Sequence, residues 1–429
     1  MKRIIYLLLA VLLFCLQSCV KDEKDLFDLP AAERINAKLQ EYSKILQDAP
    51  NGWKMEYFPE IKQSMGGYTY FCTFQNGETV MMGDLSLTLA GVDLYPAGTE
   101  ITSAYKLISD QGPVLSFDSY NPIFHYFSEP KSMIDTDGYA GDYEFVFMRQ
   151  EGDKLIMKGK KYGNTMILTR MESSPKEELE RILETQQLMA GTPYDRVEIA
   201  GKEYPLDLDY DNRQFIAEIS DTEKQQAPFL FTKSGIKFYK PIVINGETLY
   251  EFKLDKEDKT INAVDAKASI LRAPWIKILT NPTTQYIFDF NVDKNQAAMN
   301  DELFELLKAG YKANTGELFL IMYIGKNHLD NASGSTVIAF GSNGGTMFYY
   351  PSYGCEFTAT GENKDLLDIK VNKDKSYMIS WYSWCTPIAD YIEANSPYRL
   401  EDTAIDSPNS IRCVSTTNPT VWFELCLLY

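Results

Sequence analysis

Histidine is scarce in this sequence: His125 and His328 are the only two among 429 residues. No HExxH pair occurs, which excludes a helix-borne zinc protease site, and neither a Walker loop nor a strand-linked GxGxxG motif occurs. Gly341–Gly345 (GSNGG) does not have the spacing of a GxSxG nucleophile elbow. We therefore expect no metal, no cofactor and none of these catalytic motifs, and we interpret His125 as a structural, hydrogen-bonded residue.

Cysteine pairs with metal-binding or redox spacing are also missing, because no CxxC occurs among the seven cysteines. This excludes a zinc ribbon or a dense disulfide scaffold. The possibility of one or two disulfides stays open, and several thiols are expected to be small buried groups. Cys15 and Cys19 lie near the N-terminus, and the other five are Cys72, Cys355, Cys385, Cys413 and Cys426.

Long apolar runs are missing beyond the N-terminus, so no membrane-spanning helix is expected there. The N-terminus has the order of a secretory signal: Lys2 and Arg3, then the apolar run Ile4–Phe14, which is short for a span. Residues 16–19 (LQSC) resemble the lipobox of bacterial lipoproteins. This resemblance implies cleavage before Cys19 and attachment of lipid, including palmitate, to its thiol. The alternative is a secreted protein with a cysteine near its cleavage point.

A lysine followed by acids comes directly after the lipobox, in Val20–Asp25 (VKDEKD). This run resembles the surface-export signal of Bacteroidota lipoproteins, which implies an outer-membrane protein exposed on the cell surface. The simpler interpretation is a solvated tether, because a charged segment forms no core.

Basic residues are outnumbered, with 42 Lys and Arg against 60 Asp and Glu. Removal of residues 1–18, which carry Lys2 and Arg3 but no acid, takes the formal net charge from −18 to −20. So acidic a chain is poorly suited to nucleic acid or to anionic lipid headgroups. Membrane contact is expected through the N-terminal lipid alone.

Aromatic residues are plentiful, with 28 Tyr, 23 Phe and 5 Trp. Together with short alternating segments and turn signals such as Gln75–Gly77 (QNG), they predict a mainly β fold with a minor α+β component. We expect antiparallel sandwich or barrel-like domains with a few packing helices, near 30–48, 175–189 and 296–309. Strands are expected at 124–127 and 377–384, and a long loop at 386–418.

These patterns predict five consecutive segments. They are a signal peptide (1–18), a lipidated tether (19–29), an N-terminal β-rich domain with a helix at each end (30–190), a second β-rich part (191–285) and a C-terminal β-rich domain (286–429).

Clustered aromatic residues are the best candidates for ligand contacts: Trp381 and Trp384, and Tyr349 and Tyr350. Their flat faces suit sugars or peptides. The alternative is a role in the core, because Trp381 and Trp384 would point to opposite faces of one regular strand. Asp135–Gly138 (DTDG) resembles the start of a calcium loop, but the late glutamate is missing and a turn is the simpler interpretation.

Several blocks of sequence behind the lipobox resemble a Bacteroidota lipoprotein family, the domain of unknown function 4302, over roughly residues 30–260. The blocks are Gly66–Tyr70 (GGYTY), Ser109–Asn121 (SDQGPVLSFDSYN), Phe124–Pro130 (FHYFSEP), Gly141–Phe145 (GDYEF) and Gly159–Asn164 (GKKYGN). The resemblance implies no catalytic residues. It implies an accessory role in nutrient uptake, beside an outer-membrane transporter and neighbouring surface lipoproteins.

The sequence leaves three functional hypotheses. The first is a non-enzymatic accessory subunit that captures glycan or peptide for uptake. The second is a hydrolase of such polymers, because 60 acids always offer a carboxylate pair and the sequence gives no distances. The third is a structural or adhesion lipoprotein.

Overall fold

A computed structural model describes residues 30–89, 92–110, 112–130, 136–280, 285–289, 298–313, 318–327, 333–343, 348–403 and 410–427. Strands make up 48% of the structure and helices 18%, which confirms the mainly β fold. The signal peptide, the tether, Cys19 and His328 lie outside the described residues. The described residues form two compact units, one running to Ile61 and over Thr69–Pro175, the other comprising Lys62–Tyr68 and the chain from Lys176 onward.

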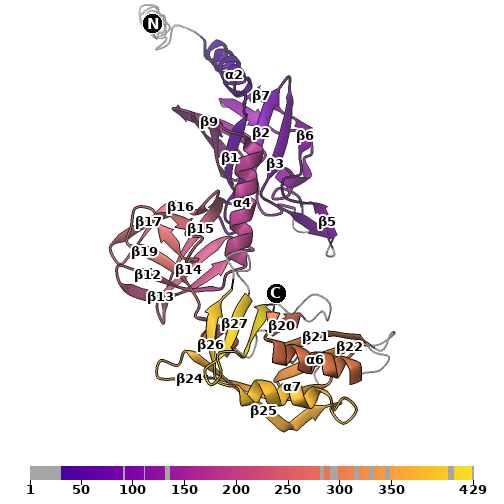
Figure 1. Ribbon diagram of the computed structural model, residues 1–429. Helices are drawn as coiled ribbons and strands as arrows, with labels where there is room; N and C mark the ends of the chain where they lie inside the picture. Colours follow the sequence, from indigo (N-terminus) through magenta and orange to yellow (C-terminus); the bar gives the residue numbers. More distant parts are fainter. Residues whose placement is uncertain are drawn as a thin grey trace, which may run out of the picture. The chain divides into compact units, whose positions relative to one another are not determined.

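The first unit is built on a nine-stranded antiparallel sheet (Figure 1) with the order β6-β3-β2-β1-β11-β10-β9-β8-β7. Its strands are β1 (Trp53–Phe58), β2 (Tyr68–Gln75), β3 (Glu78–Gly83), β6 (Ile101–Ala104), β7 (Lys106–Ser109), β8 (Pro113–Ser116), β9 (Glu144–Glu151), β10 (Lys154–Gly159) and β11 (Thr165–Arg170). A separate two-stranded hairpin consists of β4 (Leu87–Leu89) and β5 (Val92–Tyr95).

Local sequence signals explain much of this sheet. Asn76 and Gly77 both have positive φ and form the predicted turn between β2 and β3. The predicted first helix is α2 (Ala31–Gln47), which packs against β7 and β8. Its apolar face contributes Tyr42, whose ring stacks on Phe147 with centroids 4.0 Å apart.

The strand predicted at 124–127 is wrong, because these residues belong to the single helical turn α3 (Pro122–His125) and the turn after it. Pro122 occupies the first helical position, where its missing N–H costs nothing. Phe124 and Phe127 are both buried, at the spacing of one helical turn rather than of a strand.

The second unit begins with the predicted helix α4 (Pro175–Ala190) and an antiparallel closed barrel of eight strands. The barrel strands are β12 (Tyr194–Ile199), β13 (Lys202–Asp209), β14 (Gln214–Ser220), β15 (Glu223–Thr232), β16 (Gly235–Ile244), β17 (Glu247–Leu254), β18 (Ile261–Ala263) and β19 (Ala268–Arg272). Every strand pairs with its neighbour in sequence, and β19 closes on β12. Phe215, Phe238 and Phe252 fill the interior, with centroids 5.1–6.3 Å apart.

The segment Lys62–Tyr68 is held against this barrel by the buried Arg213. Its guanidinium lies 3.9 Å from the ring centroid of Tyr68 and donates a 2.7 Å hydrogen bond to the Gly67 carbonyl. A side chain at Gly66 would collide with Arg213, because a Cβ there would lie 2.4 Å from the Arg213 Cβ. The close approach of Arg213 therefore explains why position 66 is a glycine.

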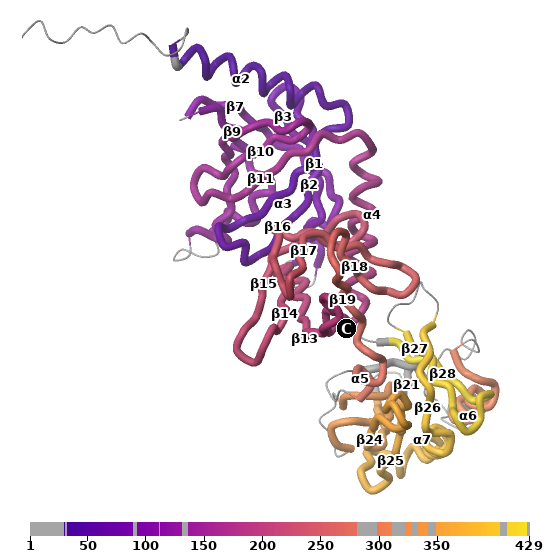
Figure 2. Tube along the Cα trace, turned by 90° about the vertical axis from the view of Figure 1, so that its left-hand side faces the viewer, coloured from indigo at the N-terminus to yellow at the C-terminus, as the bar shows by residue number. Residues whose placement is uncertain are grey.

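The C-terminal part of the second unit is a nine-stranded sheet with the order β21-β20-β28-β27-β26-β25-β24-β22-β23. Its strands are β20 (Gln285–Asp289), β21 (Leu318–Lys326), β22 (Thr336–Asn343), β23 (Phe348–Tyr349), β24 (Ser352–Thr360), β25 (Leu366–Tyr377), β26 (Tyr398–Asp402), β27 (Ser410–Ser415) and β28 (Trp422–Leu427). The trace in Figure 2 leaves β19 and passes directly into α5 (Trp275–Leu279). Helices α6 (Asp301–Ala313) and α7 (Cys385–Ala394) complete the core.

Two predictions in this part are wrong. The strand expected at 377–384 ends at Tyr377, and the following residues form turns. The loop expected at 386–418 contains α7, β26 and β27. Cys385, Ile388, Ala389 and Ile392 have helical spacing and are buried, but Pro387 and the polar residues that follow α7 hid this pattern in the sequence.

A buried carboxylate connects distant segments of the first unit. Asp142 accepts hydrogen bonds from the backbone N–H groups of Lys161 (2.7 Å), Tyr162 (3.0 Å) and Asn164 (3.1 Å). Its own N–H donates to the Tyr57 hydroxyl (2.9 Å) and to Asn164 Oδ1 (2.8 Å). Gly159 leaves room for it, because a Cβ there would lie 1.9 Å from Asp142 Oδ2. Asp142 thus joins β1, the start of β9 and the β10–β11 turn, through its backbone N–H and its carboxylate.

We expect Asp142→Ala to lower the free energy of unfolding of the first unit by about 3 kcal/mol or more, because three buried N–H groups lose a charged acceptor. Denaturant unfolding of the mature chain measures this. Asp137→Ala is the matched control, because Asp137 is exposed, its ion pair with Lys161 lies at the surface, and its loss should leave stability unchanged within error. Equal effects of the two variants would contradict the assignment.

The five described cysteines form no disulfide. Cys72, Cys355, Cys385 and Cys413 are buried, whereas Cys426 is exposed. Burial raises the pKa of the Cys355 thiol to about 12 and raises the pKa values of the other three buried thiols well above the usual range. The four buried thiols therefore stay protonated at physiological pH.

We expect a thiol reagent at pH 8 to modify one cysteine of the folded mature chain rapidly, and Cys426→Ser to abolish that fast phase. The other four thiols should react only after denaturation, because a buried neutral thiol is a poor nucleophile. Mass spectrometry of the labelled peptides identifies the sites. Fast labelling of Cys72 or Cys413 would contradict the described packing.

Candidate functional site

The four aromatic residues predicted to contact ligand have different surroundings. Trp381 lies in the turn after β25 with 84% of its surface exposed. Trp384 is half-buried and packs edge-on against Phe340, with centroids 5.8 Å apart. Tyr349 and Tyr350 are also half-buried and pack against hydrophobic clusters of the C-terminal sheet. Among these four residues, Trp381 alone presents most of its ring to solvent.

A row of three rings lies on the surface of the first unit, formed by Tyr120, His125 and Tyr143; we call it the aromatic row. The ring centroids of Tyr120 and His125 are 5.8 Å apart, and those of His125 and Tyr143 are 5.4 Å apart. The interplanar angles are 39° and 34°, so successive rings tilt only moderately. Tyr120 is 61% exposed and Tyr143 is 44% exposed. The row therefore offers two accessible tyrosines with an imidazole between them.

Three separate segments build the aromatic row. Tyr120 lies between β8 and α3, His125 ends α3, and Tyr143 directly precedes β9. The Phe117 N–H donates a 3.0 Å hydrogen bond to the Tyr143 carbonyl, which continues the β8–β9 pairing beyond the strands. Beneath the row, Phe117 and Phe124 are buried with centroids 4.6 Å apart. The rings thus stand on a close-packed aromatic core.

His125 is fixed by the backbone on both sides of its ring. Nε2 lies 3.0 Å from the Phe117 carbonyl, and Nδ1 lies 3.1 Å from the Asn121 nitrogen and 3.2 Å from the Asn121 oxygen. A neutral imidazole that donates from Nε2 and accepts at Nδ1 satisfies both sites. Burial lowers the pKa of His125, which favours this neutral form. With both nitrogens engaged by the backbone, the ring is unsuited to general-base catalysis.

Several charged groups that neighbour the aromatic row in the described part of the chain have partners. Lys160 forms ion pairs with Asp110 (2.5 Å) and Glu144 (3.0 Å), and Lys106 pairs with Asp118. The hydrogen bond between the Tyr120 hydroxyl and the Glu129 carboxylate, with burial as the second cause, raises the pKa of Tyr120 to about 12. Tyr120 therefore stays a neutral phenol over the physiological range.

Sequence reasoning placed His125 correctly as a hydrogen-bonded residue but did not single out Tyr120 or Tyr143. Tyr120 lies in the block Ser109–Asn121 and Tyr143 in the block Gly141–Phe145. Membership of these family-like blocks was the one sequence feature that could have pointed to them. The regular spacing of helices or strands could not predict that the three rings lie together, because Tyr120 and Tyr143 lie in connecting segments and His125 ends a helical turn.

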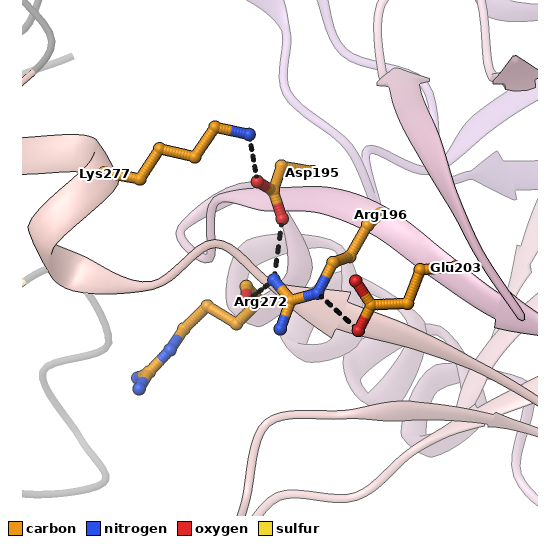
Figure 3. A network of polar contacts seen from close by, with 5 residues as sticks. All are labelled: Asp195, Arg196, Glu203, Arg272 and Lys277. Atoms are coloured by element: carbon orange, nitrogen blue, oxygen red, sulfur yellow. Dashed lines mark hydrogen bonds and ion pairs between the residues drawn. The ribbon is translucent and has the colours of Figure 1, made fainter. Parts of the chain in front are cut away.

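A polar network at one end of the barrel has a structural explanation (Figure 3). The Asp195 carboxylate accepts from Arg196 Nη1 (3.0 Å) and from Lys277 of α5 (2.6 Å). Arg196 also donates to the carbonyl of Arg272 (2.9 Å) and pairs with Glu203 (3.4 Å). The carboxylates are neutralised by cations, so the network holds β12, β13, β19 and α5 together rather than forming an acid–base pair.

The part of the chain that the structure describes contains no group of three or more His, Cys, Asp or Glu residues able to hold a metal ion. Asp137 and Gly138 of the calcium-like motif lie in a turn, and Asp137 bonds to Lys161 and Tyr162. Over the same described ranges, no helix has the length and apolar character needed to cross a membrane.

We expect the NMR titration of His125 to have its midpoint below the usual value of 6.5, because burial disfavours the imidazolium. The unfolded chain then binds the proton more readily, so the contribution of His125 to stability is lost as the pH falls below 6.5. His328→Gln leaves one histidine signal, which assigns it. A midpoint at or above 6.5 would contradict the described environment.

Comparison with known proteins supports a family but no activity. The family model described as "Domain of unknown function (DUF4302)" matches residues 23–256. No curated protein matches the chain. Two solved structures from Caulobacter crescentus, a DNA polymerase sliding clamp and a protein described as pol III beta, each share 9% identity with it. In both cases the alignment covers 92% of this chain and 98% of the other, with a TM-score of 0.11, which supports no argument about fold. The family match spans the N-terminal sheet and the barrel as far as β17, which confirms the resemblance seen in the sequence, and the chain belongs to the DUF4302 family.

Proposed function

We propose that this protein is a non-enzymatic outer-membrane lipoprotein, anchored through lipid on Cys19 and displayed on the cell surface, which captures glycan or peptide for uptake. Its expected partners are an outer-membrane transporter and neighbouring surface lipoproteins. The observation that carries the proposal is the aromatic row, in which two exposed tyrosines flank an imidazole fixed by the backbone. Rigid exposed rings are a common means of ligand capture, because little conformational entropy is lost on binding.

Capture is favoured over hydrolysis by the state of the carboxylates. A glycosidase needs one acid that can be protonated and a second that can act as a nucleophile or base. Three acids are buried among the described residues: Glu56, Asp84 and Asp142. Asp84 accepts from the Thr69 N–H, and Asp142 accepts from three backbone N–H groups. Near the aromatic row, Glu144 and Asp118 are in ion pairs. The hydrogen bonds and ion pairs of these acids stabilise the fold. We therefore place hydrolysis second to capture as a candidate function.

The anchor and the export signal support the proposed location. Residues 16–19 (LQSC) have the form of a lipobox, and Lys21, Asp22 and Glu23 follow it directly. The tether is short and charged, so it leaves the folded chain close to the lipid while keeping it in water.

Cys19→Ser should abolish incorporation of labelled palmitate and release the protein from the outer-membrane fraction. Cys15→Ser is the matched control, because it changes a cysteine four residues earlier and should leave lipidation intact. Replacement of Lys21, Asp22 and Glu23 by alanine should keep the protein in the membrane but protect it from proteinase K added to intact cells. Replacement of Lys24 and Asp25 should leave it accessible.

Retention of the lipid by the Cys19 variant would contradict the anchor, and a wild-type protein resistant to proteinase K on intact cells would contradict surface display. Affinity purification of the native lipoprotein tests its partners. If no transporter component co-purifies and neither glycans nor peptides bind, the capture function is wrong.

A further inference from the structure

We propose that the aromatic row binds the ring faces of an uncharged glycan, a proposal that rests on the capture function and decides between its two ligand classes. Tyr120 and Tyr143 would contact successive parts of the sugar chain, and His125 would supply a neutral face between them. The inference uses the geometry of the rings, the pairing of the nearby charges and the position of the row in the sheet.

The first step is the shape of the surface. The centroids of neighbouring rings lie 5.8 and 5.4 Å apart, and the rings are tilted by 39° and 34° to one another, so they are neither parallel nor perpendicular. An aromatic face carries partial negative charge, whereas the C–H groups on the face of a sugar ring carry partial positive charge. Stacking of sugar rings on Tyr120 and Tyr143 therefore combines apolar contact with a favourable electrostatic term.

The second step is the charge of the ligand. Lys106 and Lys160 are each paired with carboxylates, and Glu129 is hydrogen-bonded to Tyr120. A charged ligand has to lose water as it binds, and this cost is offset only where an unpaired opposite charge awaits it. The surroundings of the row offer paired charges, so a neutral ligand is favoured over an acidic polysaccharide or a charged peptide.

The third step separates a glycan from a peptide. An extended peptide commonly binds by adding a strand to the open edge of a sheet. The edges of this sheet are β6 and β7, whereas Tyr143 precedes the interior strand β9 and its carbonyl already accepts from the Phe117 N–H. The Tyr143 hydroxyl has no protein partner among the described residues, so it can bond to a sugar hydroxyl. The row thus offers ring faces and a phenol rather than backbone groups.

The fourth step is rigidity. His125 is held by the Phe117 carbonyl and the Asn121 backbone, and Tyr143 directly follows the buried Asp142. A surface held in this way has little freedom to lose when a flexible sugar chain binds. The weak contacts of individual rings can then add up along the chain.

The test uses residues 20–429, which lack the lipidated cysteine, on one array that carries neutral glycans, carboxylated and sulfated glycans, and peptides. Affinity is then measured by titration with the best ligand. We expect binding to neutral glycans. Tyr120→Ala and Tyr143→Ala should each weaken it by about tenfold or more, whereas Tyr120→Phe and Tyr143→Phe should keep most of the affinity because the ring remains.

Tyr377→Ala is the matched control, because Tyr377 is 41% exposed on the C-terminal sheet and should not affect binding. Unchanged thermal unfolding of the variants shows that losses of affinity do not reflect misfolding. The glycan assignment is overturned if no neutral glycan binds, or if neutral glycan binding survives both alanine substitutions. Binding of peptides that depends on the row would overturn the glycan assignment while leaving the capture function intact, so the two failures are distinguishable.

Discussion

The interaction on which the candidate site depends is the burial of the Asp142 carboxylate against backbone N–H groups. The backbone N–H groups of Lys161, Tyr162 and Asn164 donate to the carboxylate. The backbone N–H of Asp142 donates to the Tyr57 hydroxyl and to Asn164 Oδ1. A buried charge is tolerated only where such donors surround it. Because Tyr143 is the next residue, the network that satisfies the charge also determines where one ring of the aromatic row stands.

The rest of the row depends on the same region. Tyr57 packs against Phe124 and Phe127 with centroids 5.5 and 6.0 Å apart, and these rings anchor α3 from below. With α3 in place, the backbone of Asn121 meets the imidazole of His125. One core of aromatic residues therefore serves two purposes: it stabilises the first unit, and it presents three rings at its surface.

The groups around the aromatic row underlie our proposal of capture. The histidine in the row has both ring nitrogens engaged with the backbone, and the nearby acids are paired with lysines. These contacts engage the histidine and the two acids in the structure around the row. The exposed rings of Tyr120 and Tyr143 suit the reversible capture that we propose. The charges of Asp195 and Arg196 at the end of the barrel are also paired, and they connect neighbouring strands.

The sequence by itself determined the mainly β class, the hairpin at Asn76–Gly77, the helices α2 and α4, and the family, because these depend on local turns, on short-range periodicity or on ordered blocks of residues. It also predicted the anchoring cysteine, which stays a prediction. Local patterns failed at Phe124–Phe127 and at α7, where proline and tertiary burial outweighed the apparent alternation. Only the tertiary structure decided that Tyr120, His125 and Tyr143 lie next to one another, while Trp384 packs against Phe340, because contacts between segments distant in sequence follow from packing and not from spacing.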